Sequence, residues 1–223
     1  MNKRIEKIAD MVNQGVIAAD IGTDHAFLPI LLIQKNRAEK VYACDLTEGP
    51  LKAARRNIEK QGLSDRITTI LCDGFDGVPD DINCAVIAGM GFFTCTGILE
   101  RAMDRLSKLE QIIVEVNRNT SDMRKWISDH RFTVDQEVLI TERGFDYIAI
   151  SFTAKDHDPL SEEELLCGTS LLKQQEGYAQ YCDRQISKIE NVLSHVREDD
   201  GRRTVLTREL AMWNQAKESA NQE

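Results

Sequence analysis

Short apolar runs alternate with amphipathic stretches along residues 16–129 of the chain. Runs rich in Val, Ile and Ala are typical of buried strands, and apolar residues at helical spacing are typical of helices packed on a core. This alternation predicts an α/β fold, in which a mostly parallel sheet carries helices on both faces. Strands are expected at 16–21, 40–44, 67–71, 84–88 and 111–116, and helices at 28–34, 47–61, 94–109 and 120–129.

Two more strand-like segments follow the last of these helices. They cover 133–140 and 145–152, and the turn-like sequence Glu142-Arg143-Gly144 lies between them. So short a connection joins antiparallel neighbours, because parallel strands need a long crossover. We therefore expect an antiparallel hairpin at the edge of the parallel sheet.

A polar break at 154–161, which contains Pro159, precedes a tail whose pattern predicts helices alone. Ser161 and Glu164 have the spacing of a capping box, which marks the start of a helix. Apolar residues then recur at intervals of three and four on both sides of a turn at 199–201. This pattern predicts an antiparallel helical hairpin with a coiled-coil seam, which we interpret as packing. We expect two domains, an α/β domain at 1–155 and a helical hairpin domain at 156–223. The seam residues are Cys182, Ile186, Ile189, Leu193, Val196, Leu206, Leu210 and Trp213.

The composition is that of an ordinary globular chain. The 223 residues are 42% hydrophobic and 29% charged, and the formal net charge is -9. This balance excludes an overall basic nucleic-acid binder but not a local basic patch. No apolar run approaches the roughly 20 residues that span a bilayer, and the amphipathic start lacks the apolar core of a signal peptide. We expect a cytoplasmic protein without membrane contact, and we favour a monomer.

The cysteines and histidines give no metal-binding pattern. None of the six cysteines forms a C-x-x-C pair, and the four histidines are scattered along the chain. We expect reduced cysteines that pack as small apolar residues, and no metal ion.

Acidic residues stand at the carboxyl ends of the expected strands, where ligands of parallel α/β sheets bind. The first strand leads into Asp20-Ile21-Gly22-Thr23-Asp24-His25 and lacks the G-x-G-x-x-G of dinucleotide sites. Carboxylates beside a pyrophosphate would repel it, whereas they suit a ligand with positive charge. S-adenosylmethionine carries a sulfonium and an ammonium group and no phosphate. Each aspartate alone is equally compatible with a turn or a helix cap, but their recurrence favours this cofactor.

Two further positions fit the rest of the same cofactor. Asp45 follows the second strand and is placed to accept hydrogen bonds from ribose hydroxyls. Asp73 and Gly74 follow the third strand, where they could take the adenine amino group.

The segments ADIGTDHAFLPI, ACDLTEGPLKAARRNIEKQGLSDRI, CDGFDGV and IAGMG together resemble the TrmK family. The resemblance extends over the whole chain, including the helical tail. Members of this family are bacterial class I methyltransferases that use S-adenosylmethionine to modify N1 of adenine 22 in tRNA. The resemblance therefore implies a Rossmann-like methyltransferase sheet, this cofactor, and tRNA as the partner.

The resemblance also implies roles for single residues. Asn117 matches the Asn of the family's Gln-Pro-Asn and would face the target base, so Asp24 and Asn117 are the candidate catalytic residues. The implied cofactor-binding residues are Asp20, Gly22, Thr23, Asp24, His25, Asp45, Leu46, Asp73, Gly74, Gly89, Met90 and Gly91.

Methylation of adenine N1 requires little chemistry from side chains. N1 has an available lone pair that attacks the sulfonium methyl group, and the product base becomes cationic. The enzyme must position the reactants and stabilise the growing charge. Asp24 or the carbonyls of 89–91 could do this, while His25 could be a base or a capping or packing residue. In folded tRNA the adenine must leave its stack.

Basic residues near these loops form a candidate RNA-binding surface. They are Arg4, Lys52, Arg55, Arg56 and Arg118. Such a patch could contact phosphates, although a solvated helix face explains the residues at 52–60 equally well.

The chain departs from the family pattern at Phe92, Glu115 and Val116. These positions lie near the expected base pocket rather than the cofactor pocket. The alternatives to tRNA methylation are therefore a relative that binds S-adenosylmethionine and RNA or protein without turnover, and a methyltransferase with another substrate. A nicotinamide dehydrogenase is disfavoured by the acidic first loop.

Overall fold

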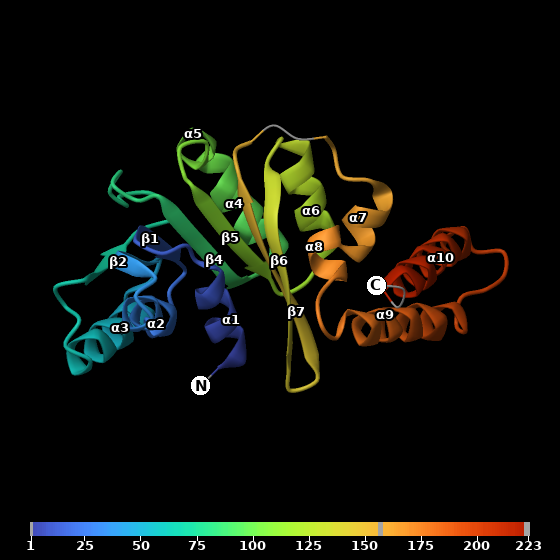
Figure 1. The fold of residues 1–223 in the computed structure, drawn as a ribbon, viewed down its shortest axis with the longest axis horizontal. Helices are drawn as coiled ribbons and strands as arrows, with labels where there is room; N and C mark the ends of the chain where they lie inside the picture. Colours follow the sequence, from blue (N-terminus) through green and yellow to red (C-terminus); the bar gives the residue numbers. More distant parts are fainter. Residues whose placement is uncertain (1, 156–157, 221–223) are drawn as a thin grey trace.

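A seven-stranded mixed sheet forms the centre of the computed structural model, which describes residues 2–155 and 158–220. The strand order is β3-β2-β1-β4-β5-β7-β6 (Figure 1). β7 pairs antiparallel with both of its neighbours, as the predicted hairpin requires. The strands are β1 Val16–Ile21, β2 Ala38–Asp45, β3 Ile67–Leu71, β4 Cys84–Met90, β5 Gln111–Val116, β6 Thr133–Glu142 and β7 Phe145–Thr153.

Helices cover both faces of the sheet, which confirms the predicted α/β architecture. α1 Lys3–Met11, α2 Phe27–Gln34 and α3 Glu48–Lys60 pack with one face in a single hydrophobic cluster. α4 Phe92–Arg101, α5 Met103–Leu106 and α6 Thr120–Asp129 pack with the other. Neighbouring strand residues divide between these clusters because successive side chains of a strand point to opposite faces.

Two predicted boundaries around β4 were wrong. β4 continues to Met90 because a bulge at Gly89, which has φ +77°, lets Met90 pair with Val116. The predicted long helix at 94–109 begins earlier, at Phe92, and breaks at Ala102. There the Ala102 N–H donates to the Leu99 carbonyl in a tight turn.

The tail is helical, as predicted, but its described residues, 158–220, form four helices. α7 Glu162–Cys167 starts with the expected capping box at Ser161 and Glu164. It is followed by α8 Ser170–Lys173, α9 Tyr178–Leu193 and α10 Arg202–Ala220. α9 and α10 form the predicted helical hairpin (Figure 1). Val196 lies beyond the end of α9, so the seam is shorter than predicted. Among the described residues, no helix is long and apolar enough to cross a membrane.

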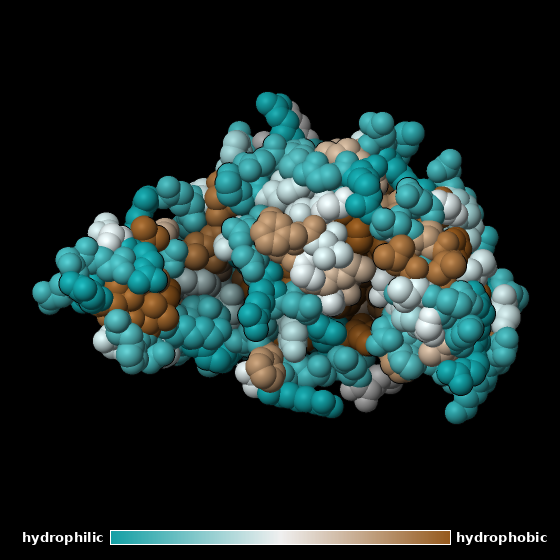
Figure 2. Space-filling view, turned by 180° about the vertical axis from the view of Figure 1, so that it is seen from behind, coloured by the Kyte–Doolittle hydropathy of each residue, from teal (hydrophilic) through white to brown (hydrophobic). Residues whose placement is uncertain are grey.

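Half of the helical hairpin packs into the core of the sheet. The rings of Tyr181 and Trp213 pack edge to face, with their centroids 5.4 Å apart. They belong to the hydrophobic cluster that also contains Trp126 of α6. The outer half is exposed at Val192 and Val205, and apolar residues gather at that end of the molecule (Figure 2). The domain division at 155/156 stays a prediction, and residues 156 and 157 lie outside the described ranges.

A buried ion pair ties the tail to the sheet. Arg124 Nε of α6 lies 2.6 Å from Glu137 Oε1 of β6, and both side chains are almost fully buried. Arg124 Nη1 also donates to the Leu165 carbonyl of α7. Glu137 Oε2 accepts from the backbone N–H and the hydroxyl of Thr169, just before α8. This pair therefore also satisfies backbone groups of two tail helices.

Replacing Arg124 with Ala should lower the free energy of unfolding by about 3–5 kcal/mol, because it leaves the Glu137 carboxylate buried without its partner. Replacing both residues with Met should cost less than the Arg124→Ala change. As a control, Arg197→Ala breaks the exposed Arg197–Asp199 pair and should change stability by no more than about 1 kcal/mol. Urea unfolding measures all three. Equal losses for Arg124→Ala and Arg197→Ala would contradict this role.

Candidate active site

A cavity of about 240 Å³ opens at the carboxyl ends of β1, β2 and β4. The opposite wall is one face of α4, which sequence reasoning missed. The structure thus brings together predicted cofactor residues from four separate loops. Those that line the cavity are Gly22, Asp45, Leu46, Asp73, Gly74 and Met90.

Gly22 is required by a close approach of Met90. Gly22 has φ +84°, and a Cβ built there would lie 2.0 Å from Met90 Cε. The Gly22 and Thr23 N–H groups both donate to the Cys44 carbonyl at 2.8 Å, which fixes the loop against β2. A side chain at residue 22 would therefore be strained and would push Met90 out of the cavity wall.

Asp45 both holds a turn and faces the cavity, so the turn interpretation and the cofactor interpretation of its position are compatible. Its Oδ1 accepts from the backbone N–H and the hydroxyl of Thr47, both at 2.7 Å, at the start of α3. The same carboxylate lines the cavity. One oxygen thus holds the turn while the side chain still faces the proposed ribose position.

Asp73 has a partner that sequence reasoning did not expect. Its Oδ1 accepts from Arg101 Nη2 of α4 at 2.7 Å, and both side chains are about half exposed. Arg101 also lines the cavity. The acidic group proposed for adenine is therefore paired with a cation in this structure.

Asp20 is the most buried carboxylate of the first loop, at 7% exposure. Burial raises its pKa to about 6, the Thr23 side chain opposes this shift, and the carboxylates of Asp45 and Asp24 add to it. An uncompensated negative charge in this position favours a cationic ligand.

The outer part of the first loop faces solvent. The side chains of Asp24 and His25 are 79% and 48% exposed, with Asp24 Oδ1 3.4 Å from His25 Nε2. Asp24 lines a second cavity of about 190 Å³ together with Asp20 and Gly22. His25 has φ 57°, and its carbonyl accepts from Asn57 of α3 at 2.9 Å.

A buried carboxylate supports the loop after β4. Glu115 of β5 is fully buried, and its Oε2 accepts from the Gly89 N–H at 3.0 Å and lies 3.3 Å from Arg4 Nη1. Asn117 Nδ2 donates to the Gly89 carbonyl at 3.0 Å. Burial raises the Glu115 pKa, and Arg4 and the Gly89 N–H oppose the shift. The departure from the family pattern at Glu115 is thus accompanied by a cation that faces it.

The two candidate catalytic residues line different cavities. Asn117 lies at the wall of a third cavity, of about 390 Å³, between the sheet and the helical hairpin. Tyr147, Lys188 and Trp213 also line it. The backbone of Gly89, bonded to both Glu115 and Asn117, is the link between this cavity and the cofactor loops.

The predicted RNA-binding residues fall into three groups. Lys52 and Arg56 are exposed on α3, and Arg118 is exposed at the third cavity. Arg55 lies 2.5 Å from Glu48 and donates to Thr69. Arg4 packs over the Tyr147 ring and faces Glu115. It is therefore part of the site and not of an open basic patch.

The residues that sequence reasoning missed lie on α4. Phe92 is half-buried against the core, so it is not the ring that faces the cavity; Phe93, at 83% exposure, is. The residues of α4 that line the cavity have the spacing of one helical face. A predicted helix starting at Phe92 instead of Thr94 would have included all of them. They are Phe93, Thr94, Gly97, Ile98 and Arg101.

A family model, curated relatives and solved structures share one family name. The family model for tRNA (adenine(22)-N(1))-methyltransferase, TrmK, matches residues 18–216. The tRNA (adenine(22)-N(1))-methyltransferase of Bacillus subtilis (strain 168) is 32% identical over 159 residues, which are 71% of this chain and 67% of that protein. The structure of M. capricolum TrmK in complex with S-adenosyl-homocysteine has 27% identity and a TM-score of 0.86, and covers 98% of both chains. A Streptococcus pneumoniae protein crystallised with S-adenosyl-L-methionine has 28% identity and a TM-score of 0.87, over 97% of this chain and 99% of that one.

Replacing Asp20 with Asn should stabilise the ligand-free protein at neutral pH. The folded pKa of about 6 exceeds the ordinary value of 3.8, so the folded state holds this proton more tightly than the unfolded state. The Asp20 contribution to wild-type stability should therefore fall as pH rises from about 4 to about 6 and then level off. At pH 7.5 the Asn variant should gain about 1–3 kcal/mol, and at pH 4 the gain should vanish. Urea unfolding at both pH values tests this, and an equal effect at both would contradict it.

Proposed function

Since the chain belongs to the TrmK family of tRNA (adenine(22)-N(1))-methyltransferases, we propose how its site carries out that reaction. The protein is an S-adenosylmethionine-dependent tRNA methyltransferase acting on N1 of adenine 22. S-adenosylmethionine binds at the carboxyl ends of β1 and β2, and the target adenine approaches beside Asn117. The buried Asp20 carboxylate carries this proposal, because it offers an uncompensated negative charge where the cofactor is cationic. We further propose that the protein works as a monomer in the cytoplasm.

The residues of the first cavity and of the loop after β1 fit the parts of the cofactor. Asp20 and Gly22 would hold its methionine end, with Thr23, Asp24 and His25 completing that loop. Asp45 and Leu46 would hold the ribose, and Asp73 and Gly74 the adenine. The backbone of 89–91 would lie beside the reacting methyl group. When bound, S-adenosylmethionine supplies that group on a sulfonium.

The protein's part in the reaction is positioning and charge stabilisation. Adenine N1 is neutral with a free lone pair, so no proton has to be removed before attack. Asn117 is held by the Gly89 carbonyl, and Gly89 is held in turn by Glu115. This chain of bonds would fix the amide that faces the base. Asp24 and the carbonyls of 89–91 would stabilise the positive charge that develops on the base.

The Glu115–Arg4 pair explains how the altered sequence is accommodated. A carboxylate oxygen accepts the Gly89 N–H as an amide oxygen would, and Arg4 offsets the added charge. Phe92 points into the core rather than into the cofactor cavity. Neither departure therefore blocks the proposed sites, which favours an active enzyme over a binding module without turnover.

Methyl transfer from labelled S-adenosylmethionine to unmodified bacterial tRNA should yield 1-methyladenosine, identified by mass spectrometry of the nucleosides. A transcript with guanine in place of adenine 22 should accept no label. Calorimetric cofactor binding without transfer to any tRNA would support the module without turnover. A different methylated nucleoside would support the other-substrate alternative.

Replacing Asp45 with Ala should weaken S-adenosylmethionine binding about 10- to 100-fold, since a hydrogen bond to a charged group contributes about 1.5–3 kcal/mol. Asp45→Asn is the matched control, because it keeps an oxygen for the Thr47 turn and one acceptor for ribose. Its loss should be smaller. Calorimetric affinity measures both, and unfolding of the ligand-free variants shows whether the turn survives. Unchanged affinity of a folded Asp45→Ala protein would remove Asp45 from the site.

A further inference from the structure

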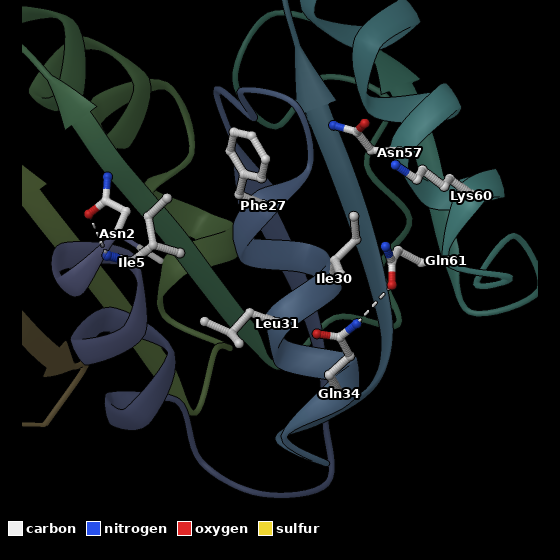
Figure 3. Close-up of a pocket in the computed structure, with 9 residues that line it drawn as sticks. All are labelled: Asn2, Ile5, Phe27, Ile30, Leu31, Gln34, Asn57, Lys60 and Gln61. Atoms are coloured by element: carbon white, nitrogen blue, oxygen red, sulfur yellow. Dashed lines mark hydrogen bonds between the residues drawn. The ribbon is translucent and has the colours of Figure 1, made fainter.

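A groove of about 660 Å³ lies between α1, α2 and α3, outside the cofactor site (Figure 3). α2 forms its floor, α1 contributes one wall, and α3 contributes the other. The floor and first wall are mainly apolar, through Ile5, Phe27, Ile30 and Leu31. A volume of this size accommodates a nucleotide rather than a single water-sized group.

An exposed aromatic ring lies at one end of the groove. Phe27 is 51% exposed, and its ring stacks on His25 with centroids 5.4 Å apart and planes 15° apart. An exposed ring already held by a neighbour loses little conformational freedom when a second planar group covers it. Bases stack on such rings irrespective of sequence, because every base has a π face.

The rim of the groove carries amides. Gln34 of α2 donates to Gln61, just beyond α3, at 3.2 Å (Figure 3). Asn57 of α3 donates to the His25 carbonyl. Amide groups offer a donor and an acceptor side by side, which is the pattern of base edges. The polar atoms of the groove thus match a nucleobase better than a purely apolar ligand.

The α3 wall adds positive charge. Lys60 lines the groove, and Lys52 and Arg56 are exposed on the same helix. No ion pair of these three side chains occurs within residues 2–155 and 158–220. A polyanion is the complementary partner for such a row of cations, and its phosphates would lie along α3 while a base enters the groove.

The groove is continuous with the methyltransferase site. Asn2, Ile5 and Phe27 line both the groove and the second cavity, whose other residues include Asp20 and Asp24. A strand that delivers one base to the site therefore passes the groove with its neighbouring nucleotide. When the target base leaves its stack, that neighbour loses a stacking partner.

We propose that this groove binds a nucleotide flanking the target adenine of the tRNA, with its base on Phe27 and its phosphate near Lys60. This subsite rests on the proposed function, and it adds a stacking contact that holds the strand while the adenine is extruded. Its occupant is RNA rather than a second copy of this chain, because the α3 wall is cationic and the groove leads into the site.

The first test compares Phe27→Ala with Phe27→Trp, using unmodified tRNA and labelled S-adenosylmethionine. Phe27→Ala should raise the KM for tRNA about 10- to 100-fold, and Phe27→Trp should restore it. The Kd for S-adenosylmethionine should stay within about threefold, which also shows that the variants are folded. Phe145→Ala is the control, because Phe145 is 67% exposed on the β6–β7 hairpin.

The second test addresses the phosphate contact. Lys60→Gln should lower the slope of log Kd for tRNA against log salt by about one. Lys108→Gln is the matched control, since Lys108 is exposed just before β5, at the opposite end of the strands. Equal slopes for Lys60→Gln and the wild type would overturn the phosphate contact.

The outcomes separate this proposal from the function beneath it. If the wild type methylates tRNA but Phe27→Ala leaves the KM unchanged, the subsite is wrong and the function stands. An equal loss of cofactor affinity would place Phe27 in the cofactor site instead. If Phe27→Ala changes the sedimentation coefficient of the protein but leaves its kinetics with tRNA unchanged, the groove binds a second copy of the chain. If the wild type methylates no tRNA, the function fails first.

Discussion

The reversal of strand order between β1 and β4 is the constraint on which the site depends. The chain moves outward from β1 to β3 and then returns to place β4 on the other side of β1. The helices that follow β1 and β4 therefore lie on opposite faces, α2 in one hydrophobic cluster and α4 in the other. Their first turns diverge and leave a crevice at the carboxyl ends of the strands. Gly22, which has positive φ and leaves no room for a Cβ beside Met90, lets the first loop enter that crevice.

Two buried glutamates each pair with an arginine of another element, one beside this crevice and one beneath the tail helices. Glu115 joins β5 to Arg4 of α1, and Glu137 joins β6 to Arg124 of α6. They differ in exposure: the Arg4 side chain is 25% exposed, whereas Arg124 is 1% exposed. The Arg124 pair is sealed and holds the tail helices by their backbone groups. The Arg4 pair is open at one side and lies directly under the loop that carries Gly89. Burial of charge thus supports the fold at one place and the geometry of the site at the other.

The sequence predicted the elements whose limits are set locally. β1, β3, β5 and α6 were placed correctly to the residue, because polar or turn-forming residues bound each of them. The extension of β4 depends on a bulge that pairs Met90 with Val116, and no local pattern contains that partner. The aspartates of the site were found because strand ends can be recognised. The basic partners of the acidic residues were not found, because they come from other elements. Arg101 reaches Asp73 across 28 positions of the sequence, and Arg4 reaches Glu115 across 111.

Two further cavities lie near this crevice, and their positions bear on how a folded RNA could reach it. On the α2 side, the second cavity joins the groove through Asn2, Ile5 and Phe27. On the hairpin side, the third cavity begins at Asn117 and runs to the tail helices. Arg4 lines the second cavity, and its partner Glu115 is bonded to Gly89, which in turn holds Asn117. A short chain of hydrogen bonds, Arg4–Glu115–Gly89–Asn117, therefore links residues that line the two cavities. An adenine extruded between them would have the rest of its strand on one side and the helical hairpin on the other. The tail is acidic overall, so it would not attract phosphates in general. It would instead serve the site by forming one wall of a cleft.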